Sequence, residues 1–106
     1  MKGDVVVVPF PFTDLSRAKR RPALVIATPE GEDVLLCQIT SQQVRDSYAI
    51  SLEDVDFSDG ALRVPSNIRP NRIFTADRRI VLYRAGSIKP EKLDQVIAAI
   101  VSILKS

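Results

Sequence analysis

A single stretch of helical periodicity lies near the C-terminal end of this sequence, and it restricts the fold more than any other feature. Apolar side chains recur there at three- and four-residue spacing, at Leu93, Val96, Ile97, Ile100, Ile103 and Leu104. Pro90 suits the first turn of a helix, and Glu91 and Lys105 suit the two ends of the helix dipole. The rest of the chain has only short apolar runs, so this helix must bury its apolar face on a sheet.

The apolar runs that precede the helix are separated by turn-forming residues, as is typical of strands. The clearest runs span residues 3–8, 21–27, 33–39 and 79–83, and shorter ones span residues 49–52, 62–64, 66–69 and 73–75. Pro9 and Gly86 are expected to end the first and the last clear strand, and a loop is expected from Pro9 to Lys19. We therefore predict a mostly β fold, a strongly bent sheet or partly open barrel closed by a C-terminal helix.

Length and charge set further limits. The 106 residues, of which 45% are hydrophobic, suit one domain spanning residues 1–106. The net charge of +2 is too small to indicate a nucleic-acid partner by itself. The basic residues nevertheless form three groups: Arg17, Lys19, Arg20 and Arg21; Arg69 and Arg72; and Arg78, Arg79 and Arg84. The distribution of charge, rather than its sum, favours an anionic partner.

Composition excludes several kinds of chemistry. The chain has no histidine and one cysteine, Cys37, so it cannot form an intrachain disulfide, the usual zinc sites or a histidine base. A lone cysteine favours a reducing cytoplasm, and no stretch is long and apolar enough to target or span a membrane. The acidic run at residues 54–60 lacks the last ligand of an EF-hand because position 65 is proline. We therefore expect no metal and no cofactor.

The first candidate for anion binding is Arg21, which directly precedes Pro22 at the start of a predicted strand. Proline holds the residue before it in an extended conformation, which would aim the guanidinium in one direction. The alternative is a solvated arginine at the start of a strand, beside the basic neighbours Lys19 and Arg20. The dipeptide alone leaves both interpretations open.

Hydroxyl and amide side chains after the predicted strand at residues 33–39 form a second candidate. Thr40, Ser41 and Gln42 follow Ile39 directly, and the end of a strand leaves hydroxyls and backbone donors available to a phosphate. Alternatively, Thr40 or Ser41 caps the turn that follows, which is a common use of hydroxyls in this position. The sequence favours neither use.

A third candidate segment combines cations, an amide, an aromatic ring and a hydroxyl, at Arg69, Asn71, Arg72, Phe74 and Thr75. Single-stranded RNA sites use this mixture to hold phosphates and unstacked bases. Further candidates for stacking on bases are Phe10, Phe12 and Tyr83. Core packing is the ordinary role of an aromatic ring, so none of these residues indicates RNA alone.

Taken in order, five blocks of the sequence resemble the MazF/PemK family of bacterial toxins. They are GDVVVVPFPFTD, KRRPALVIA, LCQITSQ, SNIRPNRIFTADRRI and the final glycine with its amphipathic helix. The resemblance spans essentially the whole chain and rests on the order and spacing of the blocks. It implies an SH3-like barrel of the MazF/CcdB type, a homodimer, metal-independent cleavage of single-stranded RNA at short motifs, and neutralisation by a cognate acidic antitoxin.

The same resemblance assigns roles to residues. The family's Arg before Pro corresponds to Arg21 and the Thr that ends the next strand to Thr40, which makes these two the expected catalytic residues. The residues expected to bind RNA are Lys19, Arg20, Ser41, Gln42, Arg69, Asn71 and Thr75. Two positions depart from the family pattern. Asn71 stands where related toxins have an acid two residues after an arginine, and Phe74 stands where many have an arginine.

Metal-free RNA cleavage uses the neighbouring 2′-hydroxyl as the nucleophile and must stabilise extra negative charge on the phosphate. Arg21 would supply mainly charge and orientation because arginine is a poor acid, and Thr40 would donate to a non-bridging oxygen. Asp14, Asp77 or another loop carboxylate would be the general base. The sequence does not choose among these carboxylates.

Two other functions fit parts of the sequence. A gyrase-directed toxin like the fold relative CcdB acts through a C-terminal tryptophan, whereas this chain has no tryptophan. A catalytically weak member that binds RNA or its antitoxin without cutting is consistent with Asn71 and Phe74. We favour the endoribonuclease over both.

Overall fold

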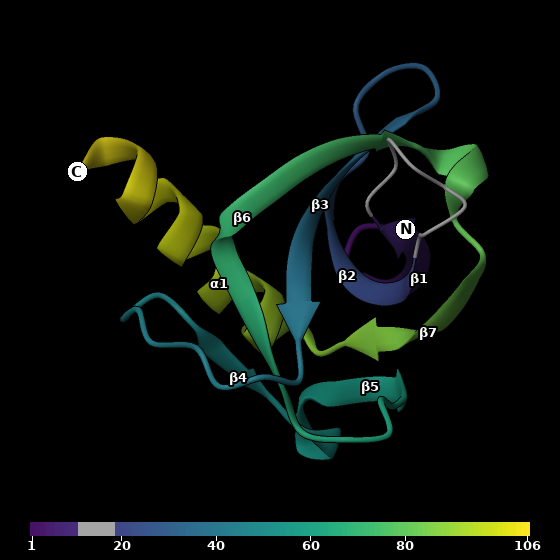
Figure 1. Ribbon diagram of the computed structural model, residues 1–106. Helices are drawn as coiled ribbons and strands as arrows, with labels where there is room; N and C mark the ends of the chain where they lie inside the picture. Colours follow the sequence, from purple (N-terminus) through teal and green to yellow (C-terminus); the bar gives the residue numbers. More distant parts are fainter. Residues whose placement is uncertain (11–18) are drawn as a thin grey trace.

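The computed structural model describes residues 1–10 and 19–106 and shows a curled antiparallel sheet with one long helix (Figure 1). The strands are β1 (Asp4–Phe10), β2 (Lys19–Ala27), β3 (Asp33–Thr40), β4 (Ile50–Leu52), β5 (Phe57–Gly60), β6 (Ser66–Asp77) and β7 (Tyr83–Ile88). Within residues 1–10 and 19–106, the helical elements are the 3-10 helices η2 (Asp54–Asp56) and η3 (Arg78–Ile80) and the helix α1 (Pro90–Lys105). The prediction of a mostly β fold with a C-terminal helix is confirmed.

The sheet curls strongly, and its two edge strands are neighbours in the chain. The order across the sheet is β4-β6-β3-β2-β1-β7-β5, with antiparallel pairing throughout. The edge strands β4 and β5 are separated only by residues 53–56, so the sheet curls until these edges lie close together (Figure 1). The result is the partly open barrel that the sequence predicts.

The sheet buries apolar side chains on both faces, which explains the uninterrupted apolar run in β1. Successive side chains of a strand point to opposite faces, so neighbouring valines enter different clusters. The helix-side cluster contains Val5 and Leu24 together with Val96 and Ile100 of α1. The second cluster, on the other face, is built around Val6, Val8, Ala23, Val25, Val34, Leu36 and Ala76. Residues of β1, β2, β3 and β6 that lie beyond the second cluster form the candidate site.

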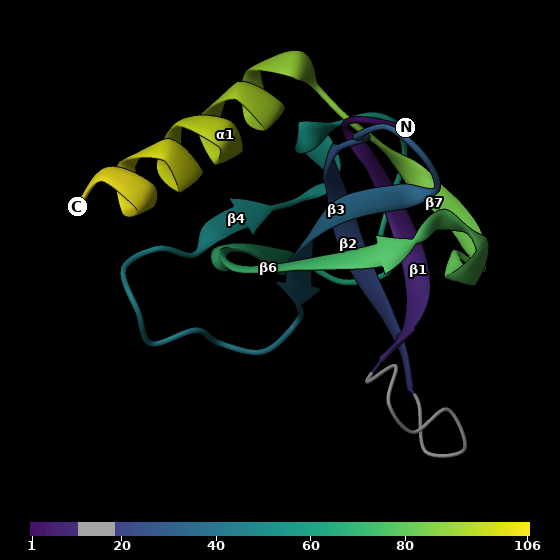
Figure 2. The ribbon, with the colours of Figure 1, turned by 90° about the horizontal axis from the view of Figure 1, so that it is seen from above.

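The C-terminal helix lies across one side of the curled sheet and contacts β6 (Figure 2). Pro90 occupies its first turn, as predicted, and the helix-side cluster receives its buried residues Val96 and Ile100. Leu104, near the helix end, is 76% exposed. Within the described part of the chain, no helix has the length and apolar character needed to cross a membrane.

The predicted strand at residues 79–83 is wrong. The Asp77 carboxylate accepts a hydrogen bond from the backbone N–H of Arg79, which caps the 3-10 helix η3 at this point. The strand β7 begins only at Tyr83 and continues through Gly86, which was expected to end it. A local side-chain cap therefore overrides the apolar pattern of this segment.

The predicted strand at residues 62–64 is absent from the structure, and β5 forms earlier, in the acidic segment. Gly60 has a φ of +71° and packs its backbone against β7. A Cβ atom at Gly86 would lie 2.5 Å from the carbonyl oxygen of Asp59. Gly86 therefore allows β5 and β7 to approach closely instead of terminating a strand.

The two predicted strands at residues 66–69 and 73–75 are parts of one strand, β6, which contains a bulge. Cys37 of β3 pairs with Ile73, whereas the next residue, Gln38, pairs with Arg69, so residues 70–72 have no partner in β3. Pro70 lacks an N–H for the ladder, and its side chain is buried in this bulge. The bulge accompanies a sharp bend in β6 and sets Arg69 where regular pairing resumes (Figure 1).

Candidate active site

Strand register places polar side chains of three neighbouring strands, β2, β3 and β6, on one face of the sheet. Arg21 lies two residues before Ala23, which pairs with Gln38 of β3, and Gln38 in turn pairs with Arg69 of β6. Paired residues of antiparallel strands point to the same face, and so do residues two apart in one strand. Thr40 follows Gln38 by two residues and shares this face. All of these side chains therefore lie beyond the second cluster.

These side chains line a cleft of about 340 Å³, which we name the Phe74 cleft. Its apolar lining comes from Val8, Phe10, Pro22, Ile39 and Phe74, and its polar lining comes from Arg21, Gln38, Thr40, Gln42 and Arg69. The rings of Phe10 and Phe74 have centroids 5.7 Å apart and planes tilted by 51°, a common aromatic packing arrangement. The cleft thus combines an aromatic wall with two cations.

A second cleft of about 280 Å³, the Tyr83 cleft, opens on the other side of the same strand ends. Arg20, Ser41, Arg63 and Tyr83 line it together with several apolar residues. Four residues line both clefts, Arg21, Pro22, Ile39 and Thr40, and together they form the shared boundary that we call the ridge. This arrangement suits a polymeric ligand, because a chain lying across the ridge reaches both clefts.

Thr40 has a structural role that does not use up its hydroxyl group. Its Oγ1 accepts a hydrogen bond of 3.1 Å from the backbone N–H of Gln42, so the turn-capping interpretation is confirmed. A hydroxyl has one donor and two acceptor positions, and the turn occupies one acceptor position. The hydroxyl of Thr40 is therefore oriented by the turn and can still donate to an anion in the cleft.

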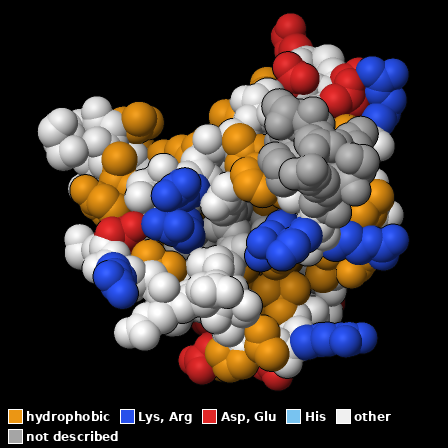
Figure 3. All heavy atoms as spheres, viewed as in Figure 1, with side chains coloured by type: hydrophobic (Ala, Val, Ile, Leu, Met, Phe, Trp, Pro, Cys, Tyr) orange, Lys and Arg blue, Asp and Glu red, His pale blue; other side chains and the backbone are white. Residues whose placement is uncertain are grey.

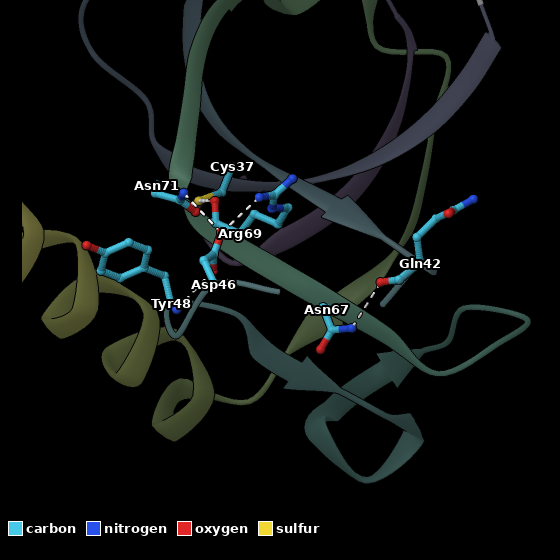
Figure 4. Close-up of polar contacts among 7 residues, drawn as sticks. All are labelled: Cys37, Gln42, Asp46, Tyr48, Asn67, Arg69 and Asn71. Atoms are coloured by element: carbon cyan, nitrogen blue, oxygen red, sulfur yellow. Dashed lines mark hydrogen bonds and ion pairs between the residues drawn. The ribbon is translucent and has the colours of Figure 1, made fainter. Parts of the chain in front are cut away.

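The two arginines of the Phe74 cleft differ in how they are held. Arg21 is exposed, and among the described residues its side chain has no hydrogen bond or ion pair. Arg69 is only 20% exposed, and its Nη2 lies 2.9 Å from Oδ2 of Asp46 (Figure 4). The cleft therefore offers one guanidinium that is available to a ligand and one that a carboxylate fixes.

Asp46 is the residue that sequence reasoning missed. Its Oδ2 also accepts a hydrogen bond of 3.4 Å from Asn71 Nδ2, and its Oδ1 accepts one of 3.0 Å from the backbone N–H of Tyr48. Desolvation acts to raise the pKa of Asp46, but the hydrogen bonds from Arg69, Tyr48 and Asn71 and the charge of Arg69 outweigh it and lower this pKa. Asp46 is therefore held as a carboxylate beside the cleft.

The clefts gather most of the predicted site residues. Arg21, Thr40, Gln42 and Arg69 line the Phe74 cleft, and Arg20 and Ser41 line the Tyr83 cleft. Three predicted RNA-binding residues line neither cleft: Lys19, Asn71 and Thr75. Thr75 pairs with Leu35 and points to the opposite face from Phe74, Asn71 lies in the bulge, and Lys19 is exposed at the start of β2.

Among the described residues, no candidate general base lines either cleft. Neither cleft is lined by a carboxylate from residues 1–10 or 19–106, and Asp14, Arg17 and Phe12 lie outside these ranges. Asp77 contacts Arg79 at 2.7 Å, and hydrogen bonds from Arg79 lower the pKa of Asp77 to about 2. Such a weak base, away from both clefts, is poorly placed to accept a proton from RNA. Nor do the described residues gather three or more side chains able to ligate a metal ion.

The Asp77–Arg79 pair predicts how the thermal stability of the protein changes with pH. The folded-state pKa of Asp77 is about 2 against an ordinary value of 3.8, so the pair stabilises the fold above about pH 4 and loses this effect as pH falls towards about 2. The Asp77→Asn variant keeps an acceptor for the η3 cap. We expect its Tm to lie below that of the parent at pH 6 and to converge with it near pH 2. Thermal unfolding followed by circular dichroism measures both, and a constant difference in Tm would contradict this assignment.

Comparison with known proteins shows which family this chain belongs to. The family model of the PemK-like, MazF-like toxins of type II toxin-antitoxin systems matches residues 1–104. No curated protein is detectably similar to this chain in sequence.

Several solved structures share the fold at low sequence identity. An endoribonuclease in complex with its cognate antitoxin, from a mycobacterial species, has a TM-score of 0.77 at 13% identity, over 99% of this chain and 94% of that one. The Mycobacterium tuberculosis toxin MazF-mt6 has a TM-score of 0.75 at 15% identity, over 96% of each chain. A MazE-MazF structure from Deinococcus radiodurans has a TM-score of 0.73 at 19% identity, over 96% of this chain and 91% of that one. At these identities the likeness establishes the fold.

Proposed function

Because this chain belongs to the PemK-like, MazF-like family of toxins of type II toxin-antitoxin systems, we propose that it is an endoribonuclease that cleaves single-stranded RNA at short motifs without a metal ion. The observation that carries the proposal is the ridge on which Arg21 and Thr40 stand between two clefts. A phosphodiester on this ridge meets a cation and a hydroxyl donor. The nucleotides on its two sides enter the Phe74 and Tyr83 clefts.

The clefts favour a single strand over a duplex. An unstacked base can pack against aromatic side chains, and the Phe74 cleft has the Phe10–Phe74 pair in its wall. Tyr83 is 52% exposed in the other cleft, where Arg20 and Arg63 add positive charge. Bases paired within a duplex could not enter either cleft.

In the proposed reaction the 2′-oxygen attacks the neighbouring phosphorus while the bond from phosphorus to the 5′-oxygen breaks. The products are a 2′,3′-cyclic phosphate and a free 5′-hydroxyl, and the leaving 5′-oxygen takes a proton from solvent. Arg21 neutralises the charge that grows on the phosphate, and Thr40 donates to a non-bridging oxygen. Asp14 or another loop carboxylate would accept the 2′-hydroxyl proton, since Asp77 is held by Arg79 outside the clefts.

A substrate comparison tests the proposed function. The purified protein is incubated, with a chelator present, with one long sequence as single-stranded RNA, duplex RNA and single-stranded DNA. We expect discrete fragments from the single-stranded RNA only. Intact RNA that still binds the protein with a salt-sensitive affinity would instead support a binding-only member of the family.

The role of Thr40 predicts opposite results for two substitutions. Thr40→Val removes the hydroxyl at nearly constant volume and should lower the cleavage rate about 10²-fold, because one preorganised donor is lost. Thr40→Ser keeps the donor and should stay within about threefold of the parent. Single-turnover rates measure both, and Thr28→Val, at an exposed position after β2, is the matched control. Equal rates for the Val and Ser variants would contradict a donor role.

We further propose that an acidic antitoxin covers this site and that the toxin acts in the cytoplasm as a homodimer of one-domain chains. The mycobacterial endoribonuclease that shares the fold is bound to its cognate antitoxin. In this protein, basic side chains form separate groups across the middle of one face, and acidic side chains lie mostly at its margins (Figure 3).

A small acidic protein encoded beside this gene should block RNA cleavage when added in equimolar amounts. Sedimentation of the free toxin tests the dimer.

A further inference from the structure

Asp46 lies outside the clefts, yet it holds one of the two arginines that line the Phe74 cleft. We propose that Asp46 is a positioning residue for RNA cleavage, which fixes the Arg69 guanidinium so that its remaining donors face the RNA. This inference rests on the proposed function and adds a residue whose partner is 23 positions away in the sequence.

The contacts of Asp46 use both carboxylate oxygens. Oδ1 binds the backbone N–H of Tyr48 and so sets the position of Asp46 within the segment that follows β3. Oδ2 binds Arg69 at 2.9 Å and Asn71 at 3.4 Å, as the dashed lines of Figure 4 show. One side of the carboxylate is thus anchored to its own segment, and the other side reaches the bulge of β6.

Arg69 is consequently fixed at both ends. Its backbone pairs with Gln38, and its carbonyl oxygen accepts a hydrogen bond of 3.2 Å from Cys37 Sγ. Its guanidinium is held by Asp46. A long arginine side chain otherwise loses much rotamer freedom when it binds a ligand, so an anchored donor acts with less reorganisation. Arg21 has no such anchor in the described structure and supplies mobile charge.

If the Asp46 carboxylate is neutralised, a purely electrostatic role and a positioning role of Asp46 predict different results. Asp46→Asn makes the site more positive by one charge, so RNA should bind as tightly as before or more tightly if charge alone matters. If Asp46 positions Arg69, the same change should slow cleavage although affinity does not fall. The asparagine keeps the oxygen that accepts from the Tyr48 N–H, so the segment retains its turn.

Exchanging Asp46 and Asn71 should restore the cleavage that Asp46→Asn loses. Because Asn71 Nδ2 lies 3.4 Å from Asp46 Oδ2, the double variant Asp46→Asn with Asn71→Asp moves the carboxylate to the other side of the same contact. Arg69 then has an acidic partner again. A role of Asp46 in folding its own segment would not be restored by an acid in β6.

The experiment compares the parent, Asp46→Asn and the double variant on the mapped RNA substrate under single-turnover conditions. We expect Asp46→Asn to cleave about tenfold more slowly with unchanged or tighter affinity, and the double variant to return to within about threefold of the parent. The matched control is Asp59→Asn, which breaks an exposed pair with Arg84 of 2.8 Å outside both clefts and should cleave within about twofold of the parent.

Four outcomes would overturn the inference. Parental cleavage by Asp46→Asn, or a loss that the double variant does not restore, would show that Asp46 does not position Arg69. A weaker affinity with an unchanged cleavage step would assign Asp46 to folding or binding. If the parent leaves RNA intact, the proposed function fails and the positioning role fails with it. Intact RNA with the parent protein is the one outcome that also rejects the endoribonuclease activity; the others reject only the role of Asp46.

Discussion

Replacing Arg21 with alanine should lower the RNA cleavage rate by a factor of at least about 10³ while changing Tm by no more than about 2 °C. The side chain is exposed and has no partner among the described residues, so its removal costs the fold little. It stands on the ridge between the clefts, where the proposed mechanism places the phosphodiester that develops extra charge. Single-turnover cleavage and thermal unfolding measure the two effects separately.

Two further variants show whether the loss of cleavage in Arg21→Ala comes from the missing guanidinium at this position or from the missing positive charge. Arg21→Lys keeps the charge without the planar fork and should recover only part of the activity. Arg79→Ala also removes one positive charge, but its partner Asp77 lies outside the clefts, and it should cleave within about twofold of the parent. A comparable loss in Arg79→Ala would mean that net charge matters. Unfolding of Arg21→Ala would make Arg21 structural.

Replacing Val96 with asparagine should destabilise the protein by about 3 kcal/mol or more. Val96 has no exposed surface and lies in the helix-side cluster, where α1 packs against the sheet. The asparagine would lose this apolar contact and bury an amide without a designed partner. Chemical denaturation should therefore show a much lower midpoint with a similar slope.

The matched control uses the same helix. Leu104 is 76% exposed near the end of α1, so Leu104→Asn should cost less than about 1 kcal/mol. If both substitutions cost the same, helix propensity would explain the loss. Equal stability of Val96→Asn and the parent would contradict the packing of α1 on the sheet.

Local patterns in the sequence were sufficient for the parts of the fold that depend on neighbouring residues. The spacing of Val96 and Ile100 predicts α1, and the apolar run at residues 3–8 predicts the strand β1. The predicted strand at residues 79–83 was wrong because the Asp77 side chain, which accepts from the backbone N–H of Arg79, caps η3 at this point. The residues of β6 appeared as two strands because a bulge depends on the register with β3, which the pattern of one segment does not contain.

The residues of the candidate site also fall into those with a local sequence signal and those that depend on distant contacts. Arg21 and Thr40 each lie in a short motif at the end of a strand, and the family resemblance assigns both to the site. In the structure both line the two clefts, and their catalytic role stays a prediction. Thr75 was expected beside Phe74, but neighbouring residues of a strand face opposite ways. Asp46 gave no local signal, since its partner Arg69 is brought near by the bulge of β6. It supplies a carboxylate beside Asn71, the position where the family pattern has an acid.

The most direct test of the account is chemical mapping of one cleaved bond, because the central claim is attack by a 2′-hydroxyl on the phosphate held at Arg21 and Thr40. Once a site is mapped, a short RNA with a single 2′-deoxy nucleotide on the 5′ side of that bond is compared with the all-ribose RNA in the presence of a chelator. We predict a 2′,3′-cyclic phosphate end from the all-ribose RNA and no cleavage at the modified position. Cleavage of the 2′-deoxy substrate, or equal cleavage by Arg21→Ala, would contradict this mechanism.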